Sequence, residues 1–468
     1  MFKHCWAALI GMAIGTSLSA TADSADYNIA EGQALSLAQS AIAMRSVRGP
    51  GNQTHQVADL FAGALRQAGW KEQDVDVVPF EDTAYLIATW PGANPELGPI
   101  VISAHMDVVE ADPADWERDP FTPVIEDGYL FGRGASDTKF DAALAVAALI
   151  ELRRSGYRPQ RGLVIAFSGD EETTMATSQV IAQRLSEARM VLNVDGASGT
   201  LDEATGEPAY WSLQGAEKTY VDFQLEVTNP GGHSSMPRDD NAITQLSLAL
   251  ARIGAHRFAP ELNEITRAYF REASAFQSDP ALAAAMRTFA EDPGDKEAID
   301  LLRADPAMIG RIATTCVPTM VKGGHAENAL PQRATAIVNC RIFPGRSIAS
   351  VQAELEEVAA VPGVQFSNFT GDMSVEAPAS PLDPDYLKAV ENALAASWGR
   401  VPIVPAQSSG ASDSMWYRAL GVASYSASAT FTKDSEDYSH GLNERIPLRN
   451  IAPGIRFYLS LFRELSSR

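Results

Sequence analysis

The chain has 468 residues, of which 46% are hydrophobic and 21% are charged, and its formal net charge is −22 at pH 7. This length is ample for two domains of roughly 100–200 residues each, and the composition is that of a globular protein. The strongly acidic balance argues against nucleic acid or an anionic membrane surface as a partner.

The first 22 residues, 1–22, have the pattern of a secretory signal peptide. A basic start at Lys3 is followed by an apolar run from Cys5 to about Ile14, and Ala20 to Ala22 fits a small-residue cleavage site. An N-terminal anchor helix is the alternative. The apolar run is short for a bilayer, however, and no later segment offers about 20 apolar residues without a charge. We therefore expect a periplasmic or secreted protein with no membrane span after removal of the signal.

Alternating strands and helices over residues 23–214 predict a layered α/β sheet. Helical spacing of apolar residues covers 31–68, and a helix is expected over 137–154. Short apolar runs that read as buried strands occupy 100–104, 163–167 and 190–194. Strand–helix–strand alternation at this spacing is typical of a sheet with helices on both faces.

The pattern changes after about residue 214. An alternating strand over 219–227 precedes a helix over 242–253, a long polar and mostly helical stretch over 258–312, and strand-like segments at 314–321 and 334–342. We interpret 215–335 as a second domain inserted into a catalytic domain made of 23–214 and 336–468. The predicted fold class is α/β, with a mixed, mostly parallel sheet flanked by helices and an inserted α+β domain.

Two cysteines, Cys316 and Cys340, remain once the signal segment is removed, and both lie in strand-like surroundings. An exported protein could pair them, because disulfides persist in oxidising compartments. Their separation in space cannot be read from the sequence. Two buried free thiols are the favoured interpretation.

Metal-binding types of residue follow the predicted core strands where each strand ends. In open α/β sheets, functional groups gather in the loops at the carboxyl ends of the strands. The residues concerned are His105 and Asp107 after the first strand, Glu171 and Glu172 after the second, Asp195 after the third, His440 beyond the strand-like 422–426, and Asp137 at the start of the helix.

Each of these residues has a structural explanation when it is taken alone. Asp137 could cap the helix, Glu171 and Glu172 could lie on a solvated loop, Asp195 could belong to a turn, and His440 could be a surface residue. Their occurrence together at successive strand ends favours a metal site.

The residue types suit zinc in a hydrolytic site, where imidazole and carboxylate ligands leave a position for water. Two metals about 3.5–4 Å apart need a bridging carboxylate, and their shared water becomes a nucleophile near neutral pH. Of the neighbouring Glu171 and Glu172, one can bind metal while the other acts as a general base. Asp107, two residues after His105, suits the role of its orienting partner.

Three motifs in this chain resemble the aminoacylase, carboxypeptidase G and carboxypeptidase S family of di-zinc metallopeptidases. They are the stretches 103–107, 132–139 and 169–172, and the resemblance extends in the same order over nearly the whole mature chain. The amino-acid sequences of 107–109 and 116–121, together with the long segment 258–312, are most similar to the carboxypeptidase S and N-acyl-amino-acid hydrolase branch.

The resemblance implies a role for each site residue. Asp137 would bridge two zinc ions, with His105 and Asp195 completing the ligands of one and Glu172 and His440 those of the other. Glu171 would be the general base and Asp107 would orient His105.

The family also implies substrate-binding residues on and near the inserted domain, which would act as a lid and can form a homodimer contact. His233, within 231–235, matches a histidine that reaches an active site, often that of the partner subunit, and stabilises the oxyanion. Arg341 matches an arginine that binds a terminal carboxylate. Asn328 and Gly410 match a substrate-binding asparagine and a backbone N–H that faces the carboxylate, although both could be simple turn residues.

The implied function is a metal-dependent exopeptidase or amidohydrolase that cleaves an amide bond next to a free carboxylate in a small peptide. An N-acyl-amino-acid deacylase would use the same site and is the alternative. An inactive binding protein on the same fold is a remote alternative, because every ligand position and the base are filled. Two zinc ions per chain are expected, while cobalt or manganese would accept the same ligands.

Overall fold

The computed structural model describes residues 27–467, and its first unit is built on a six-stranded sheet in the order β1-β2-β6-β3-β7-β17. Strands β6, β3, β7 and β17 run parallel, whereas β1 and β2 form an antiparallel edge. The strands are β1 (Val75–Phe80), β2 (Thr83–Trp90), β3 (Ile100–His105), β6 (Leu163–Ser168), β7 (Met190–Asn193) and β17 (Ser424–Ser426). The mixed, mostly parallel sheet expected from the sequence is confirmed.

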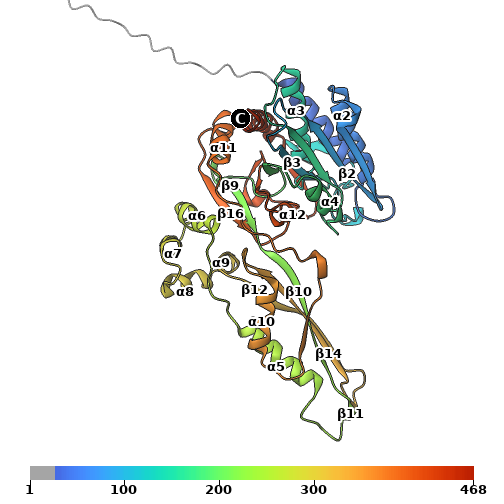
Figure 1. Cartoon of the computed structure of the whole chain (residues 1–468), viewed down its shortest axis with the longest axis vertical. Coiled ribbons are helices and arrows are strands. Elements are labelled where there is room, and N and C mark those ends of the chain that lie inside the picture. The colour runs from blue at the N-terminus through green and yellow to red at the C-terminus, as the bar shows by residue number, and fades with distance from the viewer. Residues whose placement is uncertain (1–26, 468) are drawn as a thin grey trace, which may run out of the picture.

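Helices cover both faces of this sheet (Figure 1). Alternate residues of β3 divide between the faces, since Ile100 and Ile102 join one buried cluster and Val101 joins the other. The helices that bury their apolar side chains in the cluster of Ile100 are α1 (Asn28–Ile42), α2 (Thr54–Gln67), α3 (Lys139–Arg154), α11 (Pro384–Ser397) and α13 (Ile451–Ser466). The helices α4 (Ala176–Arg184) and α12 (Ser414–Ala419) cover the opposite face.

Helix α3 lies at the centre of the first unit and positions the loop that precedes it. Its residues 139–152 are all buried. Even Lys139 is buried, and its ammonium donates to the carbonyl oxygens of Ala41 (2.9 Å) and Met44 (3.1 Å). A helix that is covered on every side is a rigid support, so the loop at its N-terminus is fixed to the core.

Two smaller sheets extend the first unit. One has the order β16-β9-β8-β18 and the other the order β19-β5-β4. Their strands are β8 (Gly199–Leu201), β9 (Pro208–Glu217), β16 (Ile403–Ser408) and β18 (Phe431–Thr432), then β4 (Val124–Glu126), β5 (Tyr129–Phe131) and β19 (Arg445–Pro447).

The second unit is an antiparallel sheet in the order β12-β14-β10-β15 with helices packed against it (Figure 1, lower half). Strand β10 follows β9 after the single residue Lys218, so the chain enters this unit along one nearly continuous strand. Its strands are β10 (Thr219–Thr228), β12 (Thr315–Gly323), β14 (Arg333–Ile342) and β15 (Gln365–Asn368), with a two-residue pair of β11 (Gly232–His233) and β13 (Ala329–Leu330) at its far end.

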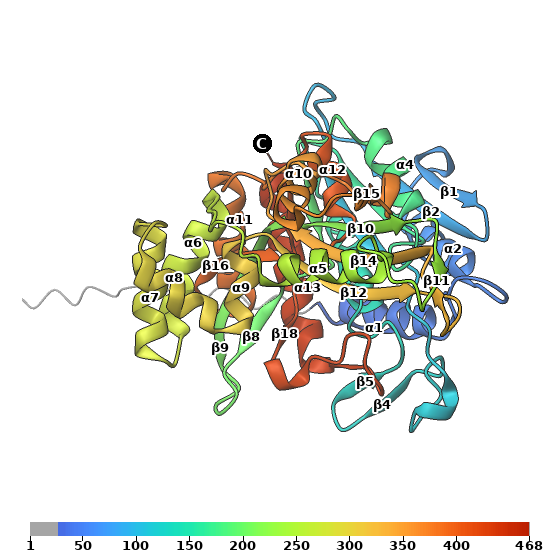
Figure 2. The same ribbon diagram turned by 90° about the horizontal axis from the view of Figure 1, so that it is seen from below.

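The helices of the second unit begin at residues suited to helix starts. Asn241, Asn263, Asp279, Asp295 and Asp305 each accept a hydrogen bond from a backbone N–H of the first turn. The helices are α5 (Ala242–Ala255), α6 (Glu264–Ala273), α7 (Pro280–Glu291), α8 (Lys296–Ala304), α9 (Pro306–Ile312) and α10 (Ile348–Ala359). Figure 2 views these helices from below, with α5 and α10 across the sheet and α6 to α9 at one side.

The boundary expected at residues 335 and 336 differs from the arrangement of the sheets. Strand β14 pairs with β10 along its whole length, and β15 pairs with the other edge of β10. Val351, Leu355 and Ala359 of α10 belong to the buried cluster of the second unit. The second unit therefore continues from β10 to β15. Only strand pairing over more than a hundred residues reveals this, and such pairing has no local signal.

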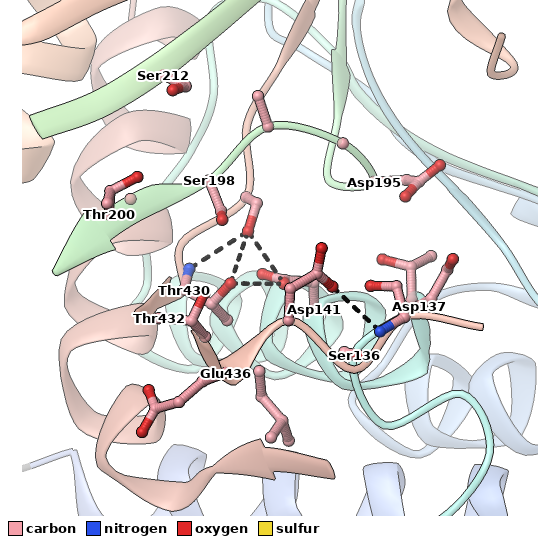
Figure 3. Close-up of a pocket in the computed structure, with 18 of the residues that line it drawn as sticks. Ser136, Asp137, Asp141, Asp195, Ser198, Thr200, Ser212, Thr430, Thr432 and Glu436 are labelled. Atoms are coloured by element: carbon pink, nitrogen blue, oxygen red, sulfur yellow. Dashed lines mark hydrogen bonds between the residues drawn. The ribbon is translucent and has the colours of Figure 1, made fainter. Parts of the chain in front are cut away.

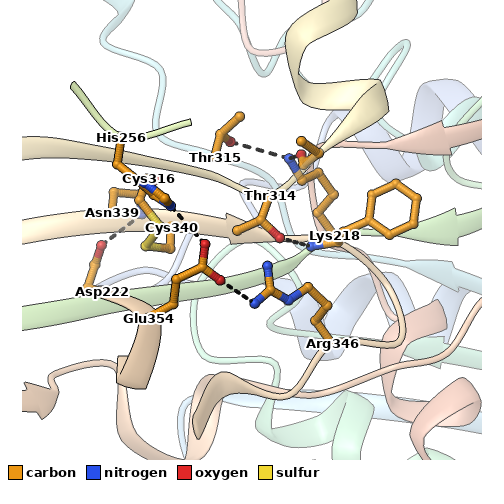
Figure 4. Close-up of a disulfide and its surroundings, with 12 residues drawn as sticks. Lys218, Asp222, His256, Thr314, Thr315, Cys316, Asn339, Cys340, Arg346 and Glu354 are labelled. Atoms are coloured by element: carbon orange, nitrogen blue, oxygen red, sulfur yellow. Dashed lines mark hydrogen bonds and ion pairs between the residues drawn. A yellow bond between two sulfur atoms is a disulfide. The ribbon is translucent and has the colours of Figure 1, made fainter. Parts of the chain in front are cut away.

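Cys316 and Cys340 form a disulfide that joins β12 to β14 (Figure 4), so the expectation of two free thiols is wrong. The two residues are directly opposite each other in the antiparallel pair. Facing positions of neighbouring strands bring side chains within disulfide reach. The pairing register of β12 and β14, which places Cys316 opposite Cys340, cannot be read from the sequence around either cysteine.

Among residues 27–467, none of the helices has the length and apolarity to cross a membrane. The expected signal peptide, residues 1–22, lies outside the described residues.

Candidate metal centre

The predicted ligands meet at the carboxyl edge of the main sheet. His105 is the last residue of β3, Glu171 and Glu172 lie in the loop after β6, and Asp195 follows β7. Asp137 lies immediately before α3, where Thr138 is the N-cap and Asp137 itself makes no capping bond to the helix.

Asp137 lies between two histidines and offers a different oxygen to each. Its Oδ1 is 2.8 Å from Nε2 of His105, and its Oδ2 is 3.1 Å from Nε2 of His440. Asp195 Oδ2 lies on the His105 side, 4.0 Å from Nε2 of His105, whereas Glu172 Oε1 lies 3.0 Å from Nε2 of His440. The five side chains thus form two half-sites that share Asp137.

Asp107 contacts residues of both half-sites. Nδ1 of His105 donates to the backbone oxygen of Asp107 (3.0 Å), which leaves Nε2 facing Asp137. The carboxylate of Asp107 accepts the backbone N–H groups of Glu171 and Glu172, each at 3.1 Å. One buried residue therefore orients the histidine ring and fixes the turn that carries both glutamates.

The close approach of these groups shifts their proton affinities. Burial, followed by the nearby Asp137 carboxylate, raises the pKa of Asp195 to about 8. Burial likewise raises the pKa of Glu171 well above its usual range, with Asp195 adding to the effect. Hydrogen bonds that the His440 imidazole donates to the carboxylates of Asp137 and Glu172 raise the pKa of His440 to about 10. Because metal ligands must be deprotonated, binding of a cation among these groups would release protons.

The donor set fits a metal ion. Ligand atoms of His105, Asp137 and Glu172 all lie within 4.8 Å of one another, and these residues combine imidazole and carboxylate donors. The two oxygens of Asp137 allow a second ion on the other side of the same carboxylate.

Glu444 holds the loop that presents Asp137, and it was not among the residues selected from the sequence. It is fully buried and accepts from Nη1 of Arg133 (2.7 Å) and from the backbone N–H groups of Gly134 (2.9 Å), Ser136 (2.7 Å) and Asp137 (3.1 Å). Its position four residues after His440 was the available signal. A carboxylate at that point has no visible partner until the loop 133–137 is folded against it.

Arg341 and Gly410 lie together at the junction of the two units. Nη1 of Arg341 donates to the backbone oxygen of Ser409 (2.8 Å), and its guanidinium lies over the ring of Tyr220 at 4.5 Å. The N–H of Gly410 donates to Oγ of Ser408 (2.9 Å). The two residues are therefore close together, and the Gly410 amide is occupied within its own loop.

His233 and Asn328 lie at the far end of the second unit, away from the metal ligands of their own chain (Figure 1, near β11). They are neighbours, because the N–H of Ser234 donates to the backbone oxygen of Asn328 (3.0 Å). His233 is exposed, and its Nδ1 accepts from Oγ of Ser235 (2.8 Å). The structure therefore does not bring these two residues to the metal centre of the same chain.

Residues 101–464 match the model of a protein family described as peptidase family M20/M25/M40. The chain belongs to this family. Membership confirms the resemblance drawn from the three motifs, and with it the assignment of the chain as a metallohydrolase that acts on amide bonds.

Among curated M20-type relatives, the chain is 25% identical over 390 residues to a probable carboxypeptidase S-like protein of Dictyostelium discoideum, covering 81% of this chain and 74% of that protein. It is 27% identical over 383 residues to the N-fatty-acyl-amino acid synthase/hydrolase PM20D1 of Xenopus tropicalis, covering 80% and 73% respectively. These similarities lie in the branch that the sequence indicated.

The fold of the chain is also that of solved M20 proteins. The crystal structure of an M20 family metallo-carboxypeptidase of Sulfolobus solfataricus superimposes with a TM-score of 0.68 at 18% identity, over 92% of this chain and 98% of that one. The expected fold class is confirmed.

Proposed function

We propose that this M20 protein cleaves the amide bond next to a free carboxylate in a small peptide, using two zinc ions held around Asp137. The shared position of Asp137 between His105 and His440 carries the proposal. His105 and Asp195 would hold one ion, and Glu172 and His440 the other. Bound there, the ions would polarise the scissile carbonyl and lower the pKa of a water molecule.

Glu171 would act as the general base. It lies beside the ligands, its backbone is fixed by Asp107, and it makes no ion pair with a cation among the described residues. A carboxylate in this position can take the proton of the attacking water and deliver it to the leaving nitrogen. Asp107 would keep His105 oriented throughout.

Arg341 would bind the free carboxylate of the substrate, with the loop of Gly410 beside it. A guanidinium offers two parallel N–H donors to a carboxylate. Among residues 27–467, the guanidinium of Arg341 forms a hydrogen bond to the backbone oxygen of Ser409 and to no other group, so donors remain for a ligand.

His233 and Asn328 would serve the active site of a second copy of the chain. Their distance from the metal ligands within one chain supports this arrangement, as does the exposed surface of the second unit. Strand β12 is an edge strand, and Val317, Met320 and Val321 on it are 58%, 55% and 67% exposed. Exposed apolar residues on the free edge of a sheet favour association, so we propose a homodimer through the second unit.

An N-acyl-amino-acid deacylase remains the second candidate for the reaction. The similarity to an N-fatty-acyl-amino acid hydrolase favours it. The same ligands, base and carboxylate clamp would serve both reactions, because only the acyl group differs.

Replacement of Glu171 tests the proposed function. In zinc-loaded protein, Glu171→Gln should lower kcat for peptides and N-acyl amino acids by at least about a hundredfold, the usual contribution of a general base. Bound metal, measured by elemental analysis, should stay at the level of the unchanged protein. Glu187→Gln, at an exposed site, is the matched control. Full activity of Glu171→Gln would refute the assigned base, and activity that survives a chelator would refute the metal.

We also propose that the protein works outside the cytoplasm, as its N-terminal sequence indicates. The disulfide between β12 and β14 supports this, because such bonds persist in oxidising compartments. Expression of the full chain with a reporter, followed by fractionation, tests it. Recovery of an uncleaved, reduced chain in the cytoplasm would contradict the proposal.

A further inference from the structure

Lys218 is a buried cation at the junction of the two units. It is the single residue between β9 and β10, and it is only 2% exposed. Its ammonium donates to the backbone oxygen of Ala313 (2.8 Å) and to Oγ1 of Thr315 (3.3 Å), where β12 begins (Figure 4). Among residues 27–467, no carboxylate contacts this ammonium. A buried positive charge without a contacting acid is unusual, because burial penalises a charge that is not paired.

Arg341 lies on the same face of the second sheet as the group that binds Lys218. Thr315 of β12 and Tyr220 of β10 are each directly opposite Arg341 of β14. Side chains at facing positions of neighbouring strands lie on one face of a sheet. The hydroxyl that accepts from Lys218 is therefore next to the guanidinium. Burial, followed by the positive charge of Arg341, lowers the pKa of Lys218 to about 7.

The loop 408–410 approaches Lys218 as well, across Gly310 of α9. A Cβ atom placed on Gly310 would lie 3.3 Å from Oγ of Ser409 and 3.8 Å from Nζ of Lys218. Those two atoms therefore border the same small space. The backbone oxygen of Ser409 in turn accepts from Nη1 of Arg341 (2.8 Å). The lysine, the arginine and the loop thus form one cluster, which we call the junction cluster.

The cavity beside the metal ligands has a different character. Its volume is about 410 Å³, and Asp137 and Asp195 form part of its wall (Figure 3). Hydroxyl groups dominate the rest of the lining, and Asp434 is exposed at the rim. Within the described chain, Lys433 is the cation of the lining, and its ammonium already donates to the backbone oxygen of Glu203 (2.9 Å). The side chains of the cavity offer no free cation to a carboxylate, whereas the junction cluster offers two neighbouring ones.

We propose that Lys218 determines the specificity of the enzyme: its buried positive charge next to Arg341 selects substrates that carry a free carboxylate. Two neighbouring cations repel each other, and an anion bound at Arg341 relieves that repulsion. A neutral group at the same place would not. Because Lys218 is buried, it acts through its charge and through the loop 408–410, while Arg341 makes the contact. It is a positioning residue in this sense.

The inference rests on the proposed function, but it does not depend on which of the two candidate reactions is correct. Dipeptides and N-acyl amino acids both end in the carboxylate that the junction cluster would bind. Alanyl-leucine and N-acetyl-leucine are therefore suitable probes, since they share the leucine carboxylate and differ in the acyl group.

Two neutral replacements test the charge of the lysine. Lys218→Met keeps the length of the side chain, and Lys218→Gln keeps an N–H donor. With zinc-loaded protein, KM for the probe that is cleaved faster should rise about tenfold in both variants, and kcat should stay within about threefold, because a charge that binds substrate and transition state alike has been lost. Lys296→Met, at an exposed position of α8, is the matched control and should change neither constant.

Binding without turnover separates specificity from a general loss of affinity. Alanyl-leucine and alanyl-leucinamide differ only in the carboxylate, and zinc-loaded Glu171→Gln binds either one without cleaving it. In calorimetry, the preference of Glu171→Gln for the free acid should fall about tenfold when Lys218→Met is added. The affinity for the amide should stay the same, because the amide carries no charge at that end.

Proton uptake gives a readout that leaves the lysine in place. The charged groups that face Lys218 are Arg341 of β14 and Glu261 before α6, and Glu261 also pairs with Arg346 (3.7 Å). The contacts of Lys218 on β12 are uncharged. A carboxylate bound nearby should raise the pKa of Lys218 above about 7, so N-acetyl-leucine should carry a fraction of a proton into zinc-loaded Glu171→Gln at pH 8 and less at pH 6. Calorimetry in buffers with different enthalpies of ionisation measures the uptake, and adding Lys218→Met should abolish it.

The outcomes distinguish this inference from the proposed function. An unchanged KM in both lysine variants, or an equal loss of affinity for the acid and the amide, would overturn the inference and leave the amide-bond hydrolase standing. Selectivity that survives in Lys218→Gln would also overturn it, because a hydrogen bond would then suffice. If the lysine variants fail to fold, the absence of proton uptake at pH 8 would decide against it. If protein that holds its zinc cleaves neither probe, the proposed function fails, and the inference fails with it unless Glu171→Gln still prefers the acid to the amide.

Discussion

At the scale of single residues, the site is organised by carboxylates that face other ionisable groups. Asp137 touches two histidines, and Asp107 holds one histidine and two backbone amides. Each acid therefore has a position fixed by more than one partner. A site fixed in this way needs little rearrangement to accept cations.

Metal binding should release protons and strengthen as the pH rises. The pKa of Asp195 is raised to about 8 by burial and by the Asp137 carboxylate, so this acid is neutral at pH 7 in metal-free protein. The pKa of His440 is raised to about 10 by Asp137 and Glu172, so this histidine is protonated there. Both must lose their protons to coordinate a metal. We expect the zinc affinity to increase from pH 6 through pH 8.

Calorimetry of zinc binding in buffers with different enthalpies of ionisation checks this at pH 7. The expected release is about one to two protons per chain. His256→Gln, at a histidine paired with Glu354 in the second unit, should release the same number. An affinity that does not change between pH 6 and pH 8.5 would contradict the prediction.

Glu444 should be as important for metal affinity as some of the ligands, although it is not one of them. Glu444→Gln removes the partner of the buried Arg133 and weakens the loop that presents Asp137. Breaking a buried ion pair from one side costs about 3–5 kcal/mol of stability, and losing a residue that orients ligands lowers metal affinity by about 10–100-fold. Denaturant unfolding and zinc titration measure the two effects. Glu357→Gln, at an exposed position of α10, should change neither.

At the scale of elements, the disulfide should stabilise the sheet of the second unit. It links β12 to β14 and closes a segment whose ends are 24 residues apart. A closed loop of this length contributes roughly 3 kcal/mol to the free energy of unfolding. Cys316→Ala with Cys340→Ala should lower the stability by about that amount in denaturant titrations. A reducing agent should destabilise the unchanged protein similarly and leave the double variant unaffected, and equal stability of all samples would contradict the prediction.

Helices and strands can be predicted well where neighbouring residues along the chain carry the signal, such as a short apolar run. Strands β3, β6 and β7 begin and end within about two residues of the ranges expected from their apolar runs. His105, Glu172 and Asp195 could be selected because each follows such a strand. Helical spacing was expected over 31–68 without a break, and the structure has two helices there, α1 and α2, separated by the turn-rich residues 43–53. Gly49, Pro50 and Gly51 were the available breaking signal.

Contacts between segments that are far apart in the sequence could not be predicted in this way. The end of the second unit, the Cys316–Cys340 bond and the contact of Glu444 with the loop of Asp137 all require a register or a packing that only the folded chain defines. The cavity beside Asp195 is a further case. Its hydroxyls come from segments more than two hundred residues apart, and serines and threonines are too common to be selected individually.

At the scale of the whole molecule, the separation of His233 from the metal ligands predicts a shared active site. The proposed metal ligands all lie in the first unit, yet the residue expected to stabilise the oxyanion lies at the far end of the second unit (Figure 1). The exposed edge of β12 and the exposed Ile243 and Leu248 of α5 provide apolar surface for a second copy. Val321→Lys should prevent its association, because a charge on an edge strand opposes pairing.

Mixing two inactive variants tests the shared site directly. His233→Ala and Glu171→Gln should each be inactive alone, and both should keep their metal. In a mixed dimer, the chain that carries His233→Ala retains its own Glu171 and receives His233 from its partner, so one of its two sites is complete. Random exchange of subunits should then restore about a quarter of the activity of the unchanged protein. The same mixture carrying Val321→Lys in both chains should stay inactive and elute as monomers in light-scattering chromatography. If His233 acted within its own chain, no mixture would recover activity, and the homodimer proposed here would lose its functional reason.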